Sequence, residues 1–192
     1  MVAIGVRIIL LCLLAAGFAY LLGNSGCSTL VDVSTSCGMV CGHPCDHGYM
    51  FIGIAYAIPL TGPLRWRPPV ELTCWNDTLI ATDFKFMCAQ VRPWSDKGTV
   101  MGSEDCLYVN VWTPSMNHKA KLRVMVWIHG GCLLSISGSE PSYSPNEDLV
   151  RESHIVHVSF NYRLNAFGFL ALTELREESP TNTSGNHSTM HA

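Results

Sequence analysis

The 192-residue sequence is short of charge, since only 14% of its residues are Asp, Glu, Lys or Arg and the net charge is −3. It has no basic stripe and no cluster of Lys and Arg interleaved with aromatic residues, which excludes a nucleic-acid-binding surface. It also lacks internal repeats. Hydrophobic residues make up 48% of the chain, which is too many for a disordered protein. The length suits one globular domain.

Charge is almost absent from the N-terminus. After Arg7, residues 8–23 carry no charge. The length of this run is intermediate between the apolar core of a signal peptide, roughly 7–15 residues, and a membrane-spanning helix, roughly 17–25 residues. Small residues before Cys27 permit cleavage, so residues 1–26 are interpreted as a signal peptide or a signal anchor. Both alternatives predict a secreted, extracellular or ER-lumenal protein, whose only membrane contact would be an anchor at residues 8–23.

The nine cysteines indicate an oxidising compartment. Three N-glycosylation sequons agree with export, at Asn76, Asn182 and Asn186. The sequence alone leaves disulfide connectivity open for Cys27, Cys37, Cys41, Cys45, Cys74 and Cys132, and makes Cys74 a candidate partner for one of the three at 37, 41 and 45.

His43 and His47 are interleaved with Cys37, Cys41 and Cys45, which raises a zinc cluster as an alternative. The spacing fits no common structural zinc pattern. Disulfides are therefore favoured, and we expect no metal and no other cofactor.

Strand patterns run through most of the chain after the leader. Residues 31–57 alternate β-forming residues with glycine, which predicts short strands joined by tight turns. Residues 103–114 show a period of two and end at a proline. Residues 122–129 and 154–164 are dense in β-branched and aromatic side chains, which predicts strands buried on one or both faces.

Helix signals are fewer. Ser144 before Pro145 predicts the start of a short crossover helix within residues 144–153. Four prolines favour an extended surface segment over residues 58–75. The polar sequence from Glu174 onward is interpreted as loop. The order strand, glycine-rich turn, short helix, strand predicts an α/β fold with a mixed or parallel sheet.

The sequence His129, Gly130, Gly131 comes directly after the strand predicted at 122–129. Glycine permits positive φ and lets an outside atom approach successive backbone amides, which together can bind an anionic oxygen. Acyl transfer needs such a site, because one donor to the tetrahedral intermediate lowers the barrier by roughly 2.7–4 kcal/mol. On its own the motif is equally compatible with a glycine turn between two strands.

Four ordered blocks extend this motif: GIAYAIPLTGPLRWRPP, SEDCLYVNVWTP, VMVWIHGGCL and VSFNYRLNAFGFLAL. Together they resemble the type-B carboxylesterase and cholinesterase family of the α/β-hydrolase fold, over about residues 31–187. The resemblance corresponds to roughly the first third of such a domain. It implies an incomplete α/β-hydrolase, with a small N-terminal antiparallel sheet and a β-rich part of the central sheet. Residues 27–187 would be a partial domain and residues 188–192 a divergent, truncated tail.

The resemblance assigns the oxyanion hole to Gly130, Gly131 and Cys132. At the position of Cys132, family members have a third glycine. Cysteine keeps its backbone N–H, but its side chain would narrow the space for the substrate carbonyl. Positive φ at this position would cost about 1–3 kcal/mol.

Two further pairs are implied by the resemblance. Cys88 and Cys106 match the first disulfide of the family, for which loop closure is worth about 3 kcal/mol. Arg65 and Glu104 match a buried structural ion pair.

A serine esterase of this family needs a nucleophile elbow, G-x-S-x-G. No serine of this sequence lies in that pattern, and Ser135, Ser137 and Ser139 simply follow the glycines. The chain is therefore interpreted as the N-terminal fragment of an exported serine carboxylic-ester hydrolase, inactive by itself, whose full-length form would act on small-molecule esters.

Two alternatives remain open. One is a non-catalytic, cholinesterase-like adhesion or binding module, and the other is a short product without function, because an incomplete sheet leaves an unpaired edge.

Overall fold

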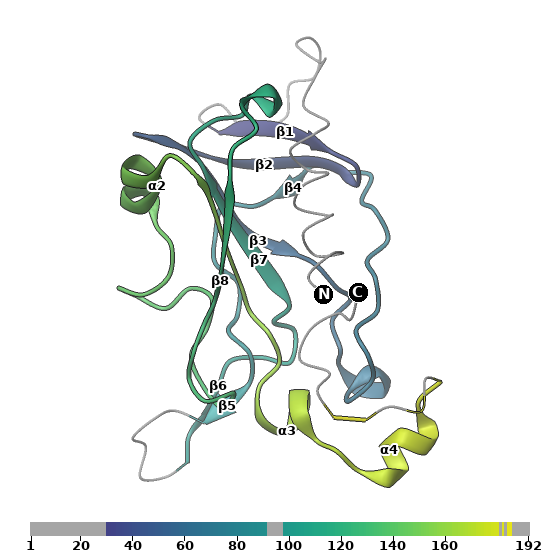
Figure 1. Cartoon of the computed structure of the whole chain (residues 1–192). Coiled ribbons are helices and arrows are strands. Elements are labelled where there is room, and N and C mark those ends of the chain that lie inside the picture. Colours follow the sequence, from purple (N-terminus) through teal and green to yellow (C-terminus); the bar gives the residue numbers. More distant parts are fainter. Residues whose placement is uncertain (1–29, 92–97, 181, 183, 186–192) are drawn as a thin grey trace.

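The computed structural model describes residues 30–91, 98–180, 182, 184 and 185. Its large sheet has seven strands: β1 (Val31–Thr35), β2 (Gly38–Cys45), β3 (Gly48–Ala55), β4 (Leu79–Ile80), β7 (Tyr108–Thr113), β8 (Val124–Ile128) and β9 (Val156–Phe160). The order is β1-β2-β3-β7-β9-β8, and β4 pairs with β2 outside this path. Figure 1 shows these strands as one twisted layer.

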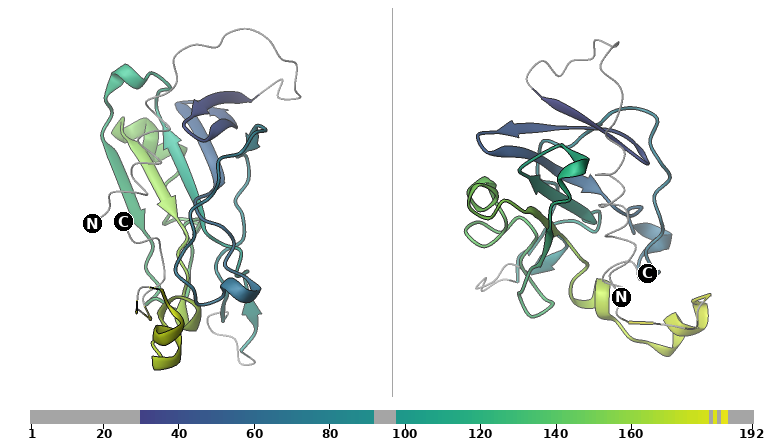
Figure 2. Two further views of the ribbon diagram at one scale, coloured as in Figure 1. Left: turned by 90° about the vertical axis from the view of Figure 1, so that its right-hand side faces the viewer. Right: turned by 45° about the horizontal axis from the view of Figure 1, so that its top comes forward.

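Short elements complete the described part of the chain. The helices are α2 (Glu147–Ser153), α3 (Asn165–Phe169) and α4 (Thr173–Glu178), with single 3₁₀ turns η1 (Gly62–Leu64) and η2 (His118–Ala120). A two-stranded sheet consists of β5 (Gln90–Val91) and β6 (Val100–Met101). The views in Figures 1 and 2 place α3, α4 and this small sheet at one end of the large sheet, the end at which β8 and β9 finish.

Both strand directions occur in the large sheet. β1, β2, β3, β7 and β9 pair antiparallel in succession, whereas β8 runs parallel to β9 and β4 runs parallel to β2. The crossover between the parallel strands β8 and β9 contains α2. The prediction of an α/β fold with a mixed sheet is therefore confirmed.

The core lies on the central strands. One buried cluster combines valines of β7 and β9 with Phe51 and Ala81. A second cluster gathers around the Cys88–Cys106 disulfide, with Leu107, Tyr162 and Leu164. Burial of apolar side chains is worth about 25 cal/mol per Å², so both clusters stabilise the fold.

The strand predictions hold for β9 and only partly for β8. Four of the five residues of β9 are buried, as its dense apolar sequence predicts. β8 has no fully buried residue, and the side chains of Met125 and Ile128 are 38% and 65% exposed. The reason is its position, since β8 is the last strand in the sheet order and pairs only with β9 among the described residues. Residues 161–164, predicted as strand, follow the end of β9.

The helix predictions need two corrections. α2 begins at Glu147, and its N-cap is Asn146, whose side chain accepts a hydrogen bond from the Leu149 amide. The start predicted at Ser144 is therefore two residues before the observed N-cap. The segment from Glu174 onward is not loop throughout, because α4 covers Thr173–Glu178. An ion pair of 2.9 Å between Arg67 and Glu178 connects α4 to the proline-rich segment.

The predicted leader (residues 1–26), the tail (188–192) and the sequon at Asn186 lie outside the described residues. None of the described helices has the length and apolar character needed to cross a bilayer.

Candidate oxyanion site

The turn that follows β8 contains the candidate site, Gly130, Gly131 and Cys132. Gly131 has φ +97° and Cys132 has φ +55°, so both lie in the left-handed region. A Cβ on Gly131 would lie 2.1 Å from the carbonyl oxygen of Ser135, whereas a Cβ on Gly130 would meet no atom within 4 Å. The turn therefore requires glycine at position 131 but not at position 130.

The backbone of this turn folds back on one carbonyl group. The oxygen of Gly131 accepts hydrogen bonds from the amides of Leu134 (3.0 Å) and Ser135 (3.1 Å). The amides of Gly130, Gly131 and Cys132 donate to no acceptor among the described residues, and Gly130 and Cys132 are exposed. These three amides therefore lack an acceptor within the described structure, which is one requirement of an oxyanion site.

His129 holds the start of the turn against Tyr162, in the segment that follows β9. Its buried ring stacks on Tyr162, with ring centroids 4.2 Å apart. The Tyr162 hydroxyl donates to the carbonyl of His129 (2.7 Å), and the Nδ1 of His129 donates to the carbonyl of Gly130 (2.9 Å). Burial lowers the pKa of His129 and keeps the ring neutral at pH 7. His129 is thus a structural support of the turn.

The second half of the turn is held by buried amide side chains. Gln90 accepts from the Ile136 amide (2.7 Å) and donates to its carbonyl (3.0 Å). Asn161 accepts from the Gly138 amide (2.8 Å), and the Ser159 hydroxyl donates to the Gly138 carbonyl (2.6 Å). These bonds fix the path of the turn at its far end.

The three serines of the turn have no base beside them in the described structure. The hydroxyls of Ser137 and Ser139 lie 3.1 Å apart, and the Ser135 hydroxyl donates to the Gly131 carbonyl at 3.4 Å. None of these hydrogen bonds involves a histidine or a carboxylate, so nothing here activates a serine as a nucleophile.

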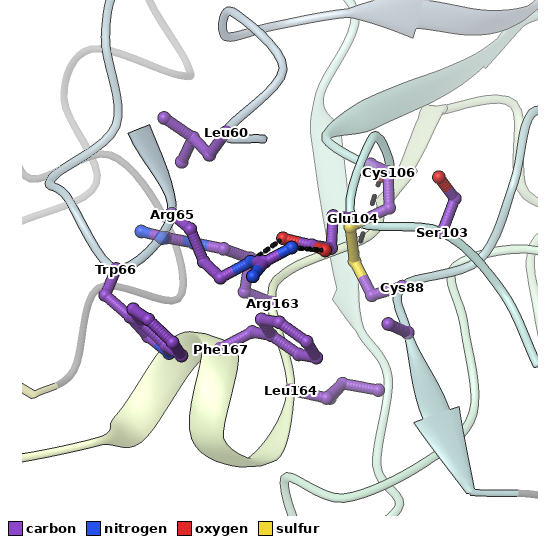
Figure 3. A pocket seen from close by; sticks show the side chains of 11 residues that line it. Leu60, Arg65, Trp66, Cys88, Ser103, Glu104, Cys106, Arg163, Leu164 and Phe167 are labelled. Atoms are coloured by element: carbon purple, nitrogen blue, oxygen red, sulfur yellow. Dashed lines mark hydrogen bonds and ion pairs between the residues drawn. A yellow bond between two sulfur atoms is a disulfide. The ribbon is translucent and has the colours of Figure 1, made fainter. Parts of the chain in front are cut away.

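Arg65 and Glu104 form a two-point ion pair beside the Cys88–Cys106 disulfide, shown in Figure 3. The Arg65 Nε donates to Glu104 at 2.6 Å, and this hydrogen bond raises the pKa of Arg65. The Arg65 guanidinium also lies 5.6 Å from the ring centre of Trp66 and 5.9 Å from that of Phe167. The resemblance implied a buried ion pair. The side chains of Arg65 and Glu104 are instead 40% and 22% exposed, so the pair is only partly buried.

The hollow in Figure 3 lies between this ion pair, the Cys88–Cys106 disulfide and the buried Arg163. Its volume of about 10 Å³ has room for about one water molecule. Burial lowers the pKa of Arg163 to about 10. The hollow is too small for an ester substrate, so the exposed turn is the better candidate site.

Among the described residues there are two disulfides, Cys88–Cys106 and Cys37–Cys74. The second settles which of the three candidate cysteines pairs with Cys74. Cys45 and Cys132 are free thiols, and burial raises the pKa of Cys45. No three His, Cys, Asp or Glu side chains are grouped to hold a metal ion in the part of the chain that is described. Asn76 and Asn182 are exposed.

The carboxylesterase family model matches residues 29–187 of this sequence. The chain belongs to the carboxylesterase family. Its fold is that of the α/β-hydrolase carboxylesterases among the solved structures.

Individual carboxylesterases give the extent of the similarity. Fumonisin B1 esterase of Sphingopyxis macrogoltabida is 39% identical over 138 residues, which are 71% of this chain and 25% of that protein. Para-nitrobenzyl esterase of Bacillus subtilis (strain 168) is 39% identical over 153 residues, 78% of this chain and 31% of that protein. The structure of carboxylesterase EST55 of Geobacillus stearothermophilus superposes with a TM-score of 0.70 and 34% identity, covering 83% of this chain and 31% of that one. The chain thus spans less than a third of the length of these carboxylesterases.

The sequence of this carboxylesterase-family chain predicts the turn but not the side chains that hold it. Asn161 and Tyr162 lie in the block VSFNYRLNAFGFLAL, whose density of amide and aromatic residues after a buried strand was an available signal. Gln90 stands two residues after Cys88 in a segment without any distinctive pattern. Only the fold brings it to the turn, across a separation of 46 residues.

Two buried histidines predict a loss of stability in acid. Burial lowers the pKa of both His129 and His157, so the unfolded chain binds protons at a higher pH than the folded chain does. The free energy of unfolding should be steady above pH 6.5 and fall below it, by up to about 1.4 kcal/mol per pH unit for each histidine.

Urea unfolding at pH 7.5, 6.5 and 5.5 measures this fall. His157→Gln is the matched variant, because glutamine retains a polar atom for the Ser153 hydroxyl, 2.6 Å from Nε2 of the histidine, and does not titrate. If the free energy of unfolding falls as steeply between pH 6.5 and 5.5 in the variant as in the natural chain, His157 does not contribute to the loss of stability in acid.

Proposed function

We propose that this chain carries the oxyanion-binding part of an exported serine carboxylic-ester hydrolase that acts on small-molecule esters. One observation carries the proposal: the amides of Gly130, Gly131 and Cys132 lie on an exposed turn and donate to no described residue. Membership of the carboxylesterase family supports the same chemistry.

The chemistry divides between this chain and residues outside it. In the complete enzyme, a serine hydroxyl attacks the ester carbonyl while a histidine accepts its proton. Collapse of the tetrahedral intermediate releases the alcohol, which takes that proton from the histidine, and water then hydrolyses the acyl-serine to the carboxylic acid. The amides of Gly131 and Cys132 donate to the carbonyl oxygen as it gains negative charge. The serine, the histidine and its acidic partner are supplied from outside the 192 residues. The chain alone does not hydrolyse esters by this mechanism, and it needs no cofactor.

Cys132 is the weak point of this site. Its amide remains a donor, but a non-glycine residue at φ +55° is strained by about 1–3 kcal/mol. Its exposed side chain stands beside the amide that the substrate oxygen would approach. This substitution favours a second candidate, a non-catalytic binding module, because binding elsewhere on the surface does not need an accessible oxyanion site.

Export is part of the proposal. Residues 1–26 act as a signal peptide or an anchor, and the two disulfides fit an oxidising compartment. The exposed Asn76 and Asn182, together with Asn186, are the proposed glycosylation sites.

A chimera tests the proposal. Residues 30–185 of this chain replace the aligned segment of the Bacillus subtilis para-nitrobenzyl esterase, which supplies the rest of the hydrolase. We expect the chimera to hydrolyse p-nitrophenyl acetate, and Cys132→Gly to raise its kcat about tenfold, which corresponds to about 1.4 kcal/mol of relieved strain and crowding. The isolated chain should not exceed the buffer rate or be labelled at serine by a fluorophosphonate.

Cys132→Ser is the matched control, because it removes the thiol while keeping a Cβ at the same positive φ. It should leave the kcat of the chimera unchanged. Activity only in the glycine variant favours the binding module for the natural chain. A folded chimera that is inactive both with cysteine and with glycine at position 132 contradicts the oxyanion assignment.

A further inference from the structure

Gln90 connects the loop closed by the Cys88–Cys106 disulfide to the turn at residues 129–138, which we call the oxyanion turn. Its side chain is buried, with 4% exposed, and makes three hydrogen bonds. Its amide nitrogen donates to the carbonyls of Cys88 and Ile136 (both 3.0 Å), and its oxygen accepts from the Ile136 amide (2.7 Å). Both backbone groups of Ile136 are therefore bound by one side chain.

The backbone that carries Gln90 is itself fixed. Cys88 is joined to Cys106 by the disulfide, and both residues are buried in the second core cluster. The Ala89 amide donates to Ser103 and the Ser103 amide donates to Met87, each at 2.9 Å. The backbone that carries Gln90 is thus held by the disulfide and by these two backbone hydrogen bonds.

The turn needs such a support, because several of its residues have unfavourable backbone angles. Besides Cys132, Leu133 has φ +63° and Ile136 has φ +78°. Positive φ is a genuine outlier for a β-branched residue such as isoleucine. Conformations of this kind persist only where the surroundings over-determine them, and at Ile136 the Gln90 amide group binds both the N–H and the C=O.

We propose that Gln90 is a positioning residue for the oxyanion turn, anchored by the Cys88–Cys106 disulfide. It acts through Ile136 and does not touch the substrate. The inference rests on the proposed function for its catalytic meaning, since the turn it holds is the proposed oxyanion site. Without the Gln90 amide group, Ile136 relaxes toward negative φ and the hydrogen bonds that close the turn on the Gly131 carbonyl weaken.

The test is Gln90→Met in the full chain, which keeps the length of the side chain and removes its hydrogen bonds. The reporters are the amides of Leu134 and Ser135, which donate to the Gly131 carbonyl, whereas the Gln90 side chain is bonded to Cys88 and Ile136. Hydrogen exchange resolved by NMR should become at least tenfold faster at these two amides. Exchange at Val158, in the central strand β9, should change by less than twofold.

Thr113→Val is the matched control. Thr113 is equally buried, and its hydroxyl hydrogen-bonds the backbone of Ser115 at the end of β7 that lies beside the start of β9, away from the turn. It should not accelerate exchange at Leu134 and Ser135 relative to Val158. Equal effects of the two variants, or none from Gln90→Met, overturn the proposal.

A second variant covers the case in which Gln90→Met does not fold. Gln90→Glu keeps the acceptor for the Ile136 amide and loses the two donated bonds, so exchange at the two reporter amides should again become faster, by a smaller factor. An unchanged rate overturns the proposal. These measurements use no substrate, so an inactive chimera in which Gln90 still protects the turn contradicts the proposed function alone.

Discussion

Gly131→Ala should lower the free energy of unfolding by about 3 kcal/mol and disrupt the turn after β8. Two effects add at this position. The backbone has φ +97°, which L-residues with a Cβ rarely adopt. The new Cβ would also lie 2.1 Å from the Ser135 carbonyl oxygen. This oxygen belongs to the peptide unit whose N–H, that of Ile136, donates to Gln90.

The adjacent glycine provides the control. Gly130→Ala places its Cβ in open space and at an ordinary φ, so the free energy of unfolding should change by no more than about 0.5 kcal/mol. Urea unfolding of the three proteins, followed by circular dichroism, makes the comparison. Equal losses for the two alanine variants contradict the turn geometry described for Gly131.

The strands were predictable from the sequence because their patterns are local. Alternating β-formers and glycines predict the hairpins of β1, β2 and β3, and the dense apolar run at 154–164 predicts the buried strand β9. Glycine after a strand also predicts the turn at Gly131, because glycine is the residue that adopts positive φ readily.

The remaining features depend on neighbours that a local pattern does not show. The exposure of Met125 and Ile128 follows from the place of β8 at the end of the sheet order. α4 forms in a polar segment without a clear apolar stripe, and a contact far away in sequence, the ion pair from Glu178 to Arg67, accompanies it. The hydrogen bonds between Gln90 and Ile136 likewise form only when the fold brings the disulfide-closed loop and the turn together.

Removing the two disulfides one at a time should show that core position outweighs loop length. Loop-closure entropy alone predicts about 3 kcal/mol for Cys88–Cys106, with a separation of 18 residues, and about 4 kcal/mol for Cys37–Cys74, with a separation of 37. By that measure the second bond matters more.

The surroundings reverse this order. Cys88 and Cys106 are buried in the second core cluster, so replacing both by alanine also leaves unfilled space there. The same change releases the backbone that supports Gln90, whereas Cys74 is exposed and Cys37 is only partly buried. We expect a loss of about 5 kcal/mol for Cys88→Ala/Cys106→Ala and about 3–4 kcal/mol for Cys37→Ala/Cys74→Ala, measured by urea unfolding. If the second pair costs more, the stabilisation is set by chain entropy, and the link from the disulfide through the core to the oxyanion turn contributes little to the stability of the fold.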